Sequence, residues 1–437
     1  MSDLRLTLGR AVWCLLTALV LSVGLPSARM AAASTTIRVP HDYASIQAAI
    51  NAASAGDIVE IAPGTYRENV TIDKSVELRG EVYDATDPRN NSAILDGGGM
   101  AVITIPPGVS PSPSVIGLVI TNGHDGIATR SSSIIRHSYF SDNNDGIDFR
   151  AGGGGVCKKN VFERSQDDAI DVDHPMSDLR IRGNQILHGS TGDDGIEIRL
   201  HDDEIAETAE IAIVNNEIVG SGEDGIQIID YFQDTNRQIT IDGNLIRNSA
   251  MAGIGLMDNG VTLEDFRGAS IREPIDVFHN TFVDNNHGIS GGDNLVALNN
   301  IFAGNVLAIK NVDGGSIASY NLLWNNVTDA QSSVVDGTTT ILADPLLDGN
   351  YELQVGSRPI DAGTAYFEWR GEVIMNQPPS AYFGSAPDLG WHEHRPVADE
   401  APIKRKASPE HRSLPLGRSA LWPTPSNVRA RGVRTTA

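Results

Sequence analysis

Carboxylate side chains recur at matching places in the middle of the sequence. Asp148, Asp171 and Glu197 each directly follow an isoleucine that is itself preceded by glycine or alanine, and Asp173 follows two residues after Asp171. If these segments are neighbouring strands, the carboxylates lie about 4.8 Å apart and repel one another unless they are protonated, paired or metal-bound. Ca²⁺ prefers oxygen ligands of this kind. The pattern therefore predicts a calcium site made by Asp148, Asp171, Glu197 and Asp173.

A second acidic series and two arginines flank the first. An aspartate directly precedes the small residue of five successive repeats, at Asp125, Asp145, Asp168, Asp194 and Asp224, and Asp168 and Asp194 are the most crowded members of this series. Aspartate before glycine is ordinary turn chemistry, but the crowding favours these two as catalytic acids. Arg150 and Arg199 each stand two residues after a carboxylate of the first series. They are predicted either to act as the catalytic base, which needs a strongly lowered pKa, or simply to neutralise the carboxylates; tight ion pairs would favour the second interpretation.

Inserted loops follow the strands that carry these residues. The insertions at 199–210, 229–238 and 257–274 are expected to stand as walls beside the acidic positions, and loops on a rigid scaffold are where binding usually occurs. Tyr231, Phe232 and His201 in these walls are the predicted substrate contacts, although the aromatic rings could equally pack the loops onto the scaffold. His174, His188 and His201 are expected at unrelated positions of the repeat, so they predict no metal site.

The scaffold itself is a repeat. Each Gly-Ile or Ala-Ile segment alternates apolar and polar residues with a period of two, which indicates a short strand. After each of these segments the sequence has an asparagine, with a large apolar residue two positions later. Successive asparagines from Asn160 to Asn321 lie 24, 32, 28, 36, 20 and 21 residues apart. A period in this range indicates a solenoid, and stacked β-coils fit it better than helices. Asparagine suits the tight bends because it tolerates the left-handed conformation.

The ends of the chain differ from the middle. Residues 1–33 have Arg5 and Arg10, an apolar run at 11–25 and small residues near Ala33, which predicts a signal peptide. Residues 34–343 are the predicted β-helix, and residues 45–53 are expected to form a short helix that covers its first coil. Residues 344–396 are the predicted capping strap, and residues 397–437, rich in Pro, Arg and Ser, the predicted disordered basic tail.

Charge excludes some classes of partner. The 437 residues include 33 Lys and Arg against 56 Asp and Glu, a net charge of −23. Residues 399–437 carry +5 and residues 1–33 carry +2, so the part between carries −30. Such a body does not suit nucleic acid, which needs a basic face. Once the leader is removed, only Cys157 remains, which excludes an intramolecular disulfide and a cysteine-based metal site.

The termini of the repeat region resemble a known fold family. Residues 39–80, which include SIQAAINAASAGDIVEIAPGTYRENVTIDKSVELRG, resemble the opening of right-handed parallel β-helix proteins of the pectin-lyase-like superfamily. Residues 344–393, with YELQVGSRPIDAG, resemble the closing segment of many secreted bacterial members. The resemblance implies an all-β fold, a right-handed parallel β-helix with an N-terminal capping helix and a C-terminal strap. The superfamily contains lyases, hydrolases, esterases, epimerases and binding proteins, so it does not fix the activity.

Three functions remain open at this point. Some lyases of the superfamily resemble this sequence in having acidic calcium ligands beside a basic residue, which favours calcium-assisted β-elimination of a uronic-acid polymer. Residues 144–146 and 166–168 resemble acidic motifs of the polygalacturonase family, but residues 193–195 read Asp-Asp-Gly where that family has Gly-His-Gly, so hydrolysis by paired carboxylates is only an alternative. The other alternative is a non-catalytic cell-surface β-helix that binds calcium or glycan.

The resulting picture is a secreted or periplasmic monomer. Its expected partner is a polysaccharide or cell-surface glycan, its expected cofactor is Ca²⁺, and it has neither a nucleic-acid partner nor a membrane span after cleavage of the leader.

Overall fold

The computed structural model describes residues 34–174, 177–188, 192–201, 208–231, 235–257, 260 and 271–395. The predicted leader (1–33) and basic tail (397–437) lie outside these residues. Within the described ranges, no helix is both long and apolar enough to cross a membrane.

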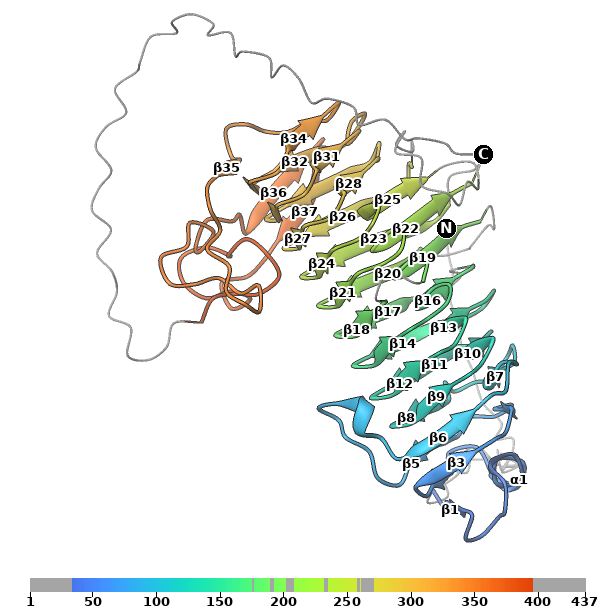
Figure 1. Ribbon diagram of the computed structural model, residues 1–437. Coiled ribbons are helices and arrows are strands. Elements are labelled where there is room, and N and C mark those ends of the chain that lie inside the picture. The colour runs from blue at the N-terminus through green and yellow to red at the C-terminus, as the bar shows by residue number, and fades with distance from the viewer. Residues whose placement is uncertain are drawn as a thin grey trace, which may run out of the picture. The chain divides into compact units, whose positions relative to one another are not determined.

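Three long parallel sheets run along the chain as a stack of coils (Figure 1). Sheet A consists of β1 (Thr36–Val39), β2 (Ile58–Ile61), β5 (Glu77–Gly80), β8 (Ser114–Ile116), β11 (Ser132–Arg136), β14 (Gly154–Lys158), β17 (Leu179–Arg182), β20 (Ala209–Val214), β23 (Arg237–Asp242), β26 (Ile275–Phe278), β29 (Leu295–Leu298) and β32 (Ile317–Ser319). Sheet B consists of β3 (Gly64–Tyr66), β6 (Ala93–Asp96), β9 (Val119–Thr121), β12 (Tyr139–Ser141), β15 (Val161–Glu163), β18 (Gln185–Leu187), β21 (Glu217–Val219), β24 (Leu245–Arg247), β27 (Thr281–Val283), β30 (Ile301–Ala303), β33 (Leu322–Trp324) and β35 (Ile341–Leu342). Sheet C consists of β4 (Val70–Thr71), β7 (Ile103–Ile105), β10 (Asp125–Thr129), β13 (Asp145–Phe149), β16 (Ile170–Val172), β19 (Ile196–Leu200), β22 (Ile226–Asp230), β25 (Ala252–Met257), β28 (His287–Ser290), β31 (Leu307–Lys310) and β34 (Thr328–Gln331).

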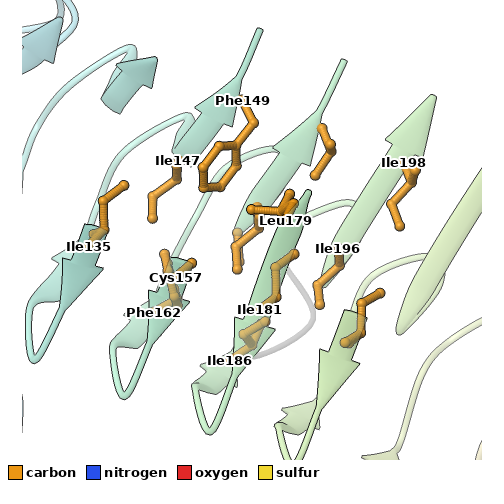
Figure 2. Close-up of a cluster of buried hydrophobic side chains, with 14 of the residues drawn as sticks. Ile135, Ile147, Phe149, Cys157, Phe162, Leu179, Ile181, Ile186, Ile196 and Ile198 are labelled. Atoms are coloured by element: carbon orange, nitrogen blue, oxygen red, sulfur yellow. The ribbon is translucent and has the colours of Figure 1, made fainter. Parts of the chain in front are cut away.

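The alternation seen in the sequence decides which side chains enter the core. In sheet C, Ile147 pairs with Ile170, which pairs with Ile196, which pairs with Ile226, and all four are fully buried. Like residues therefore stack on like from coil to coil, and the core is a continuous set of apolar columns (Figure 2). Burial of these columns along the whole stack is the main source of stability, because no coil can bury its apolar face alone.

Steric crowding explains why sheet C strands such as β13 open with a small residue. An added Cβ at Gly146 would lie 2.5 Å from the carbonyl oxygen of Ala169 and 2.6 Å from the ring of Phe162. The backbone must approach the next coil here, and phenylalanine rings stack in the adjoining layer: Phe140 and Phe162 have centroids 4.7 Å apart. Glycine or alanine at this position is therefore a packing requirement of the coil.

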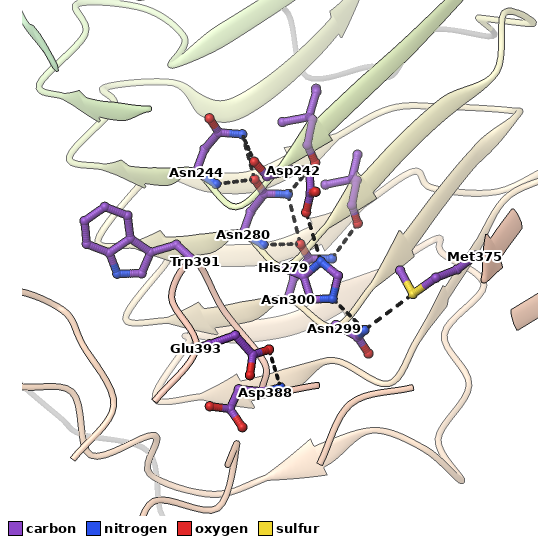
Figure 3. Close-up of polar contacts among 12 residues, drawn as sticks. Asp242, Asn244, His279, Asn280, Asn299, Asn300, Met375, Asp388, Trp391 and Glu393 are labelled. Carbon is purple, nitrogen blue, oxygen red and sulfur yellow. Dashed lines mark hydrogen bonds and ion pairs between the residues drawn. The ribbon is translucent and has the colours of Figure 1, made fainter. Parts of the chain in front are cut away.

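The predicted asparagine column is present, but the left-handed conformation expected of its members is wrong: the residue before each asparagine adopts it, as at Gly243 (φ 65°) and His279 (φ 49°), and the asparagine side chains instead bond the neighbouring coils. The backbone N–H of Asn244 donates to Oδ1 of Asn280 at 2.8 Å, and Nδ2 of Asn244 donates to the same oxygen at 2.9 Å and to the carbonyl oxygen of Ile213 at 2.9 Å (Figure 3). Asn280 repeats the pattern with Asn300. These amides are fully buried, so each bend between sheets A and B has its polar groups satisfied by the neighbouring coil.

Both ends of the stack carry extra elements. Helix α1 (Ile46–Ala52), which the sequence predicted at residues 45–53, begins at Ser45, whose side chain accepts the N–H of Ala48, and it buries Ile46, Ala49 and Ile50. Near the other end, the antiparallel hairpin of β36 (Tyr366–Trp369) and β37 (Glu372–Asn376) packs on the outer side of sheet A. A short 3₁₀ helix, η1 (Pro88–Asn90), lies in the loop between β5 and β6. The all-β fold with a capping helix and a C-terminal strap is thus as predicted.

Candidate functional site

The strands of sheet C place the predicted ligands in one row on the outer side of the sheet. Asp148 of β13 pairs with Asp171 of β16, which pairs with Glu197 of β19, which pairs with Gln227 of β22. Because the isoleucine before each of them points into the core, these side chains point away from it. We call Asp148, Asp171 and Glu197 the acidic row.

The acidic row is buried although it faces outward. Asp148, Asp171 and Glu197 are 4%, 9% and 4% exposed. Burial raises the pKa of Asp148 to about 6. Burial, together with the charges of Asp173 and Glu197, raises the pKa of Asp171 to about 9, and burial also raises the pKa of Glu197. The row therefore resists carrying a full negative charge on each member.

Arg150 and Arg199 are held by carboxylates on the same strands and their neighbours. Arg150 pairs with Asp148 through Nε, and its Nη2 donates to Oδ2 of Asp125 at 2.7 Å. Arg199 pairs with Glu197, and its Nη1 lies 3.3 Å from Oδ1 of Asp173.

The ion pairs decide the protonation of both arginines. Burial by itself would lower the pKa of Arg150, but its hydrogen bond to Asp148 and the surrounding charges raise it. Burial likewise opposes the charge of Arg199, yet the charges of Glu197, Asp171 and Asp173 raise its pKa above the ordinary value. A neutral arginine, which a catalytic base requires, is thus disfavoured, and the geometry supports the charge-neutralising interpretation.

The donor atoms of the acidic row fit a hard divalent cation. Carboxylate oxygens of Asp148, Asp171 and Asp173 lie within 4.8 Å of one another, and so do those of Asp168, Asp171 and Glu197. Asp171 belongs to both groups. Its Oδ1 and that of Asp148 are buried without a hydrogen-bond partner among the described residues. Buried carboxylate oxygens without partners are costly in a folded chain unless a cation or a proton compensates them.

The second acidic series forms a ladder of its own between coils. Oδ1 of Asp145 accepts the N–H of Asp168 at 3.2 Å, Oδ1 of Asp168 accepts the N–H of Asp194 at 3.0 Å, and Oδ1 of Asp194 accepts the N–H of Asp224 at 2.7 Å. Burial raises the pKa of Asp145 to about 7 and raises the pKa values of Asp168 and Asp194 well above the usual range. These contacts give the series a structural role, and a catalytic role for Asp168 and Asp194 stays a prediction.

Three rings stack in a column at the ends of the sheet C strands. The ring centroids of His174 and His201 lie 3.9 Å apart, and those of His201 and Tyr231 lie 4.1 Å apart. The prediction that the histidines occupy unrelated positions is therefore wrong for His174 and His201. It failed because His174 follows Asp171 by three residues whereas His201 follows Glu197 by four, and this offset hides the match in the sequence.

The column limits how its members can bind a substrate. His201 has a ring on each face, so it cannot stack on a sugar and can contact one only through the edge of its ring. Nη1 of the buried Arg237 donates to the carbonyl oxygen of His201 at 2.7 Å and fixes the start of the loop. Burial raises the pKa of Tyr231, and the charges of Arg199 and Glu197 also act on it, which places its phenol near the acidic row. Phe232 lies outside the described residues.

Comparisons with known proteins concern the fold. The model of the family "Right handed beta helix region" matches residues 90–233. Among solved structures, the chain is similar to the pectate lyase Pel9A, with 15% identity, a TM-score of 0.49, and coverage of 80% of this chain and 91% of that one. It is also similar to an alginate lyase from Paenibacillus sp. str. FPU-7, with 16% identity, a TM-score of 0.31, and coverage of 70% of this chain and 97% of that one. A third similar structure is the A-module of the mannuronan C-5 epimerase AlgE4 from Azotobacter vinelandii, with 16% identity, a TM-score of 0.37, and coverage of 69% of this chain and 96% of that one.

A comparison with curated proteins finds no match. The family match covers the coils that carry the acidic row, and the parallel strand order extends the same architecture from β1 to β35. The chain therefore folds as a right-handed parallel β-helix, and its coils at residues 90–233 match the family of that description.

Proposed function

We propose that the chain acts on an acidic polysaccharide at the acidic row, by calcium-assisted β-elimination of a uronic-acid polymer. The observation that carries the proposal is the set of buried, outward-facing carboxylates with unpartnered oxygens at Asp148 and Asp171. Asp148, Asp171 and Asp173 would hold the cation, and Glu197 would join Asp171 on the neighbouring coil. When bound, Ca²⁺ would offset the charge of a substrate carboxylate and so make the proton on C5 of that sugar more acidic.

The arginines fit an electrostatic role in this reaction. Removal of the C5 proton leaves negative charge on the sugar, the C4–O bond then breaks, the electron pair forms a C4=C5 double bond, and the departing oxygen takes up a proton. Arg150 and Arg199 keep their positive charge beside the row, so they can stabilise the negative charge that develops.

Another group must then accept the proton. Imidazole is a common general base near neutral pH, and the stacked rings of His174 and His201 follow Asp171 and Glu197 by three and four residues. We assign proton removal to this column in place of the arginines.

A specific observation favours a second candidate function. Arg150 and Arg199 are both engaged by carboxylates, as expected if they serve only to balance charge. The same row could then bind Ca²⁺ for rigidity or adhesion without turnover. In either case we propose a monomer, secreted or periplasmic, with a polysaccharide or cell-surface glycan as its partner.

The test is ultraviolet absorbance of the unsaturated product on pectate, alginate, glucuronan and chondroitin, with Ca²⁺ or with a chelator. We expect product that requires Ca²⁺ on one of these polymers and is lost in Asp171→Asn. Asp276→Asn is the matched control, because Asp276 is also a partly buried carboxyl with a raised pKa, but lies on sheet A. No product with intact Ca²⁺ binding would support the non-catalytic candidate. No product and no Ca²⁺ binding would contradict both.

A further inference from the structure

A row of basic side chains lies on the outer side of sheet A. Arg136 of β11 pairs with Lys158 of β14, and Lys158 pairs with Arg182 of β17. These three strands are immediate neighbours in the sheet (Figure 1). We call Arg136, Lys158 and Arg182 the basic row. Its members are about 4.8 Å apart from strand to strand, so the row spans about 10 Å.

The core fixes the direction of these side chains. Ile135, Cys157 and Ile181 directly precede the three basic residues, and all are completely buried on the inner side of the same strands (Figure 2). Successive side chains of a strand point to opposite faces, so the basic row points outward. Arg182 is exposed, and Arg136 and Lys158 are partly exposed.

The basic row has no acidic partner among the described residues. In the same part of the chain, Arg79, Arg89, Arg150, Arg164 and Arg199 all pair with carboxylates. No ion pair or side-chain hydrogen bond joins Arg136, Lys158 or Arg182 to any described residue, although acidic residues outnumber basic ones by 56 to 33 in the chain. Aligned like charges repel, so the arrangement costs stability unless an anion binds there.

Neighbouring side chains strengthen the positive charge. Lys159 follows Lys158, Arg180 lies two residues before Arg182, and both are exposed without an ion pair among the described residues. The positive charges reach His137, whose pKa is lowered first by burial and further by Arg136, Lys159 and Lys158.

The remaining neighbours are an acid and two apolar residues. Asp178 lies at the far end of the strand, and its Oδ1 accepts the N–H of Glu210 at 3.0 Å. Ile134 and Val156, both partly exposed, lie beside the row on the same face. The surface therefore presents one line of positive charge next to a short apolar strip of Ile134 and Val156, whose column continues in Arg180.

We propose that the basic row is a second binding site for an extended uronic-acid polymer, separate from the acidic row. A polymer with one carboxylate on each sugar presents a single line of evenly spaced charges, which matches a single line of cations one strand apart. The apolar strip suits the C–H faces of the sugar rings. Double-stranded DNA fits less well, because its charges are denser and lie on two strands, and because the body around the row is acidic. The site shares a substrate class with the proposed function but none of its residues.

The experiment measures binding of polygalacturonate and alginate in the presence of a chelator, so that calcium cannot bridge the polymer to the acidic row. The test variant replaces all three residues of the basic row by glutamine. The matched control replaces Arg38, Arg67 and Arg130, three exposed arginines elsewhere, by glutamine. A single change, Lys158→Glu, repeats the test with the least disturbance of the fold.

We expect the wild type to bind, the test variant to bind about tenfold more weakly, and the slope of log affinity against log salt to fall by roughly 2 because three contacts are lost. The control should bind like the wild type. Equal binding by the test variant, equal loss in the control, or no wild-type binding overturns the proposal. Tighter binding of duplex DNA or anionic vesicles than of either polymer, through the same residues, overturns it as well. Because these measurements use no calcium and no turnover, they hold whether or not product forms at the acidic row.

Discussion

Replacement of Asp171 by asparagine should stabilise the chain in a chelator and abolish its stabilisation by calcium. Asp171 has a pKa of about 9 in the folded chain, because it is buried and faces Asp173 and Glu197. Near neutral pH without a cation it is therefore mostly protonated. Asparagine resembles the protonated acid in shape and charge, so the fold tolerates the change, but a neutral amide cannot replace a charged ligand of Ca²⁺.

The size of the effect follows from proton linkage. The folded pKa lies above the unfolded value of about 3.9, so the contribution of Asp171 is fully present below pH 4 and is lost as the pH rises toward 9. Each pH unit in this window costs about 1.4 kcal/mol, which gives about 3 kcal/mol between pH 5 and pH 7. For Asp276, whose pKa is about 6, the loss over the same interval is about 1.4 kcal/mol.

Thermal unfolding in a chelator at pH 5 and pH 7 measures this difference. For about 360 folded residues, 3 kcal/mol corresponds to a shift of roughly 4 °C. The wild type should melt at a lower temperature at pH 7 than at pH 5, and Asp171→Asn should remove most of this decrease. Asp276→Asn should reduce the decrease by about half as much as Asp171→Asn does. Calcium at 100 times its Kd should raise the free energy of unfolding of the wild type by about 2.7 kcal/mol. The same calcium concentration should leave the free energy of unfolding of Asp171→Asn unchanged. A less stable Asp171→Asn in the chelator, or one that calcium still stabilises, would refute the assignment.

Three further changes test neighbouring parts of the argument. Arg199→Gln leaves the buried Glu197 without its cation, so the free energy of unfolding in a chelator should fall by about 2 kcal/mol. Calcium should restore most of this loss in a melting experiment. An equal loss with calcium present would show that the arginine does not act at the cation site. Asn244→Ala leaves buried N–H and C=O groups of two coils unpaired and should cost about 3 kcal/mol by urea unfolding, whereas Asn51→Ala, at an exposed helical position, should cost almost nothing. Gly225→Ala places a methyl group 2.8 Å from a carbonyl oxygen of the next coil and should cost about 2 kcal/mol by the same assay, and an unchanged midpoint would contradict the close approach of the coils.

The repeat could be predicted from the sequence because the same pattern of residues recurs in successive coils. Alternation sets which side chains enter the core, a small residue opens most of the sheet C strands, and an asparagine closes each bend before sheet B from Asn160 to Asn321. These signals are local, and stacking in register repeats them. The acidic row followed directly, because Asp148, Asp171 and Glu197 hold the same place relative to the opening residue.

Other features depend on positions that the repeat does not fix. The column of His174, His201 and Tyr231 begins where the strands end and loops of different length start, so equal spacing from the strand is lost. The ion pairs of Arg150 and Arg199 depend on side-chain conformation, which alternation does not specify. The basic row could have been found, because each member stands two residues before the residue that closes the bend, at Ser138, Asn160 and Asn184.

The two rows together address a difficulty that net charge raises. A chain with a net charge of −23 repels a polyanion that approaches its surface, and burying carboxylates at the acidic row does not remove that repulsion. A cation at the acidic row attracts the polymer only over short distances, because salt screens charges beyond about 10 Å. The basic row lies on the same coils, at the opposite end of sheet A from the loops that follow sheet C. It can hold one stretch of a long polymer and raise the local concentration of the rest, by the logic of two linked sites. On this argument, neutralising the basic row should weaken action on long polymers and leave action on short oligosaccharides, which cannot reach both rows, unchanged.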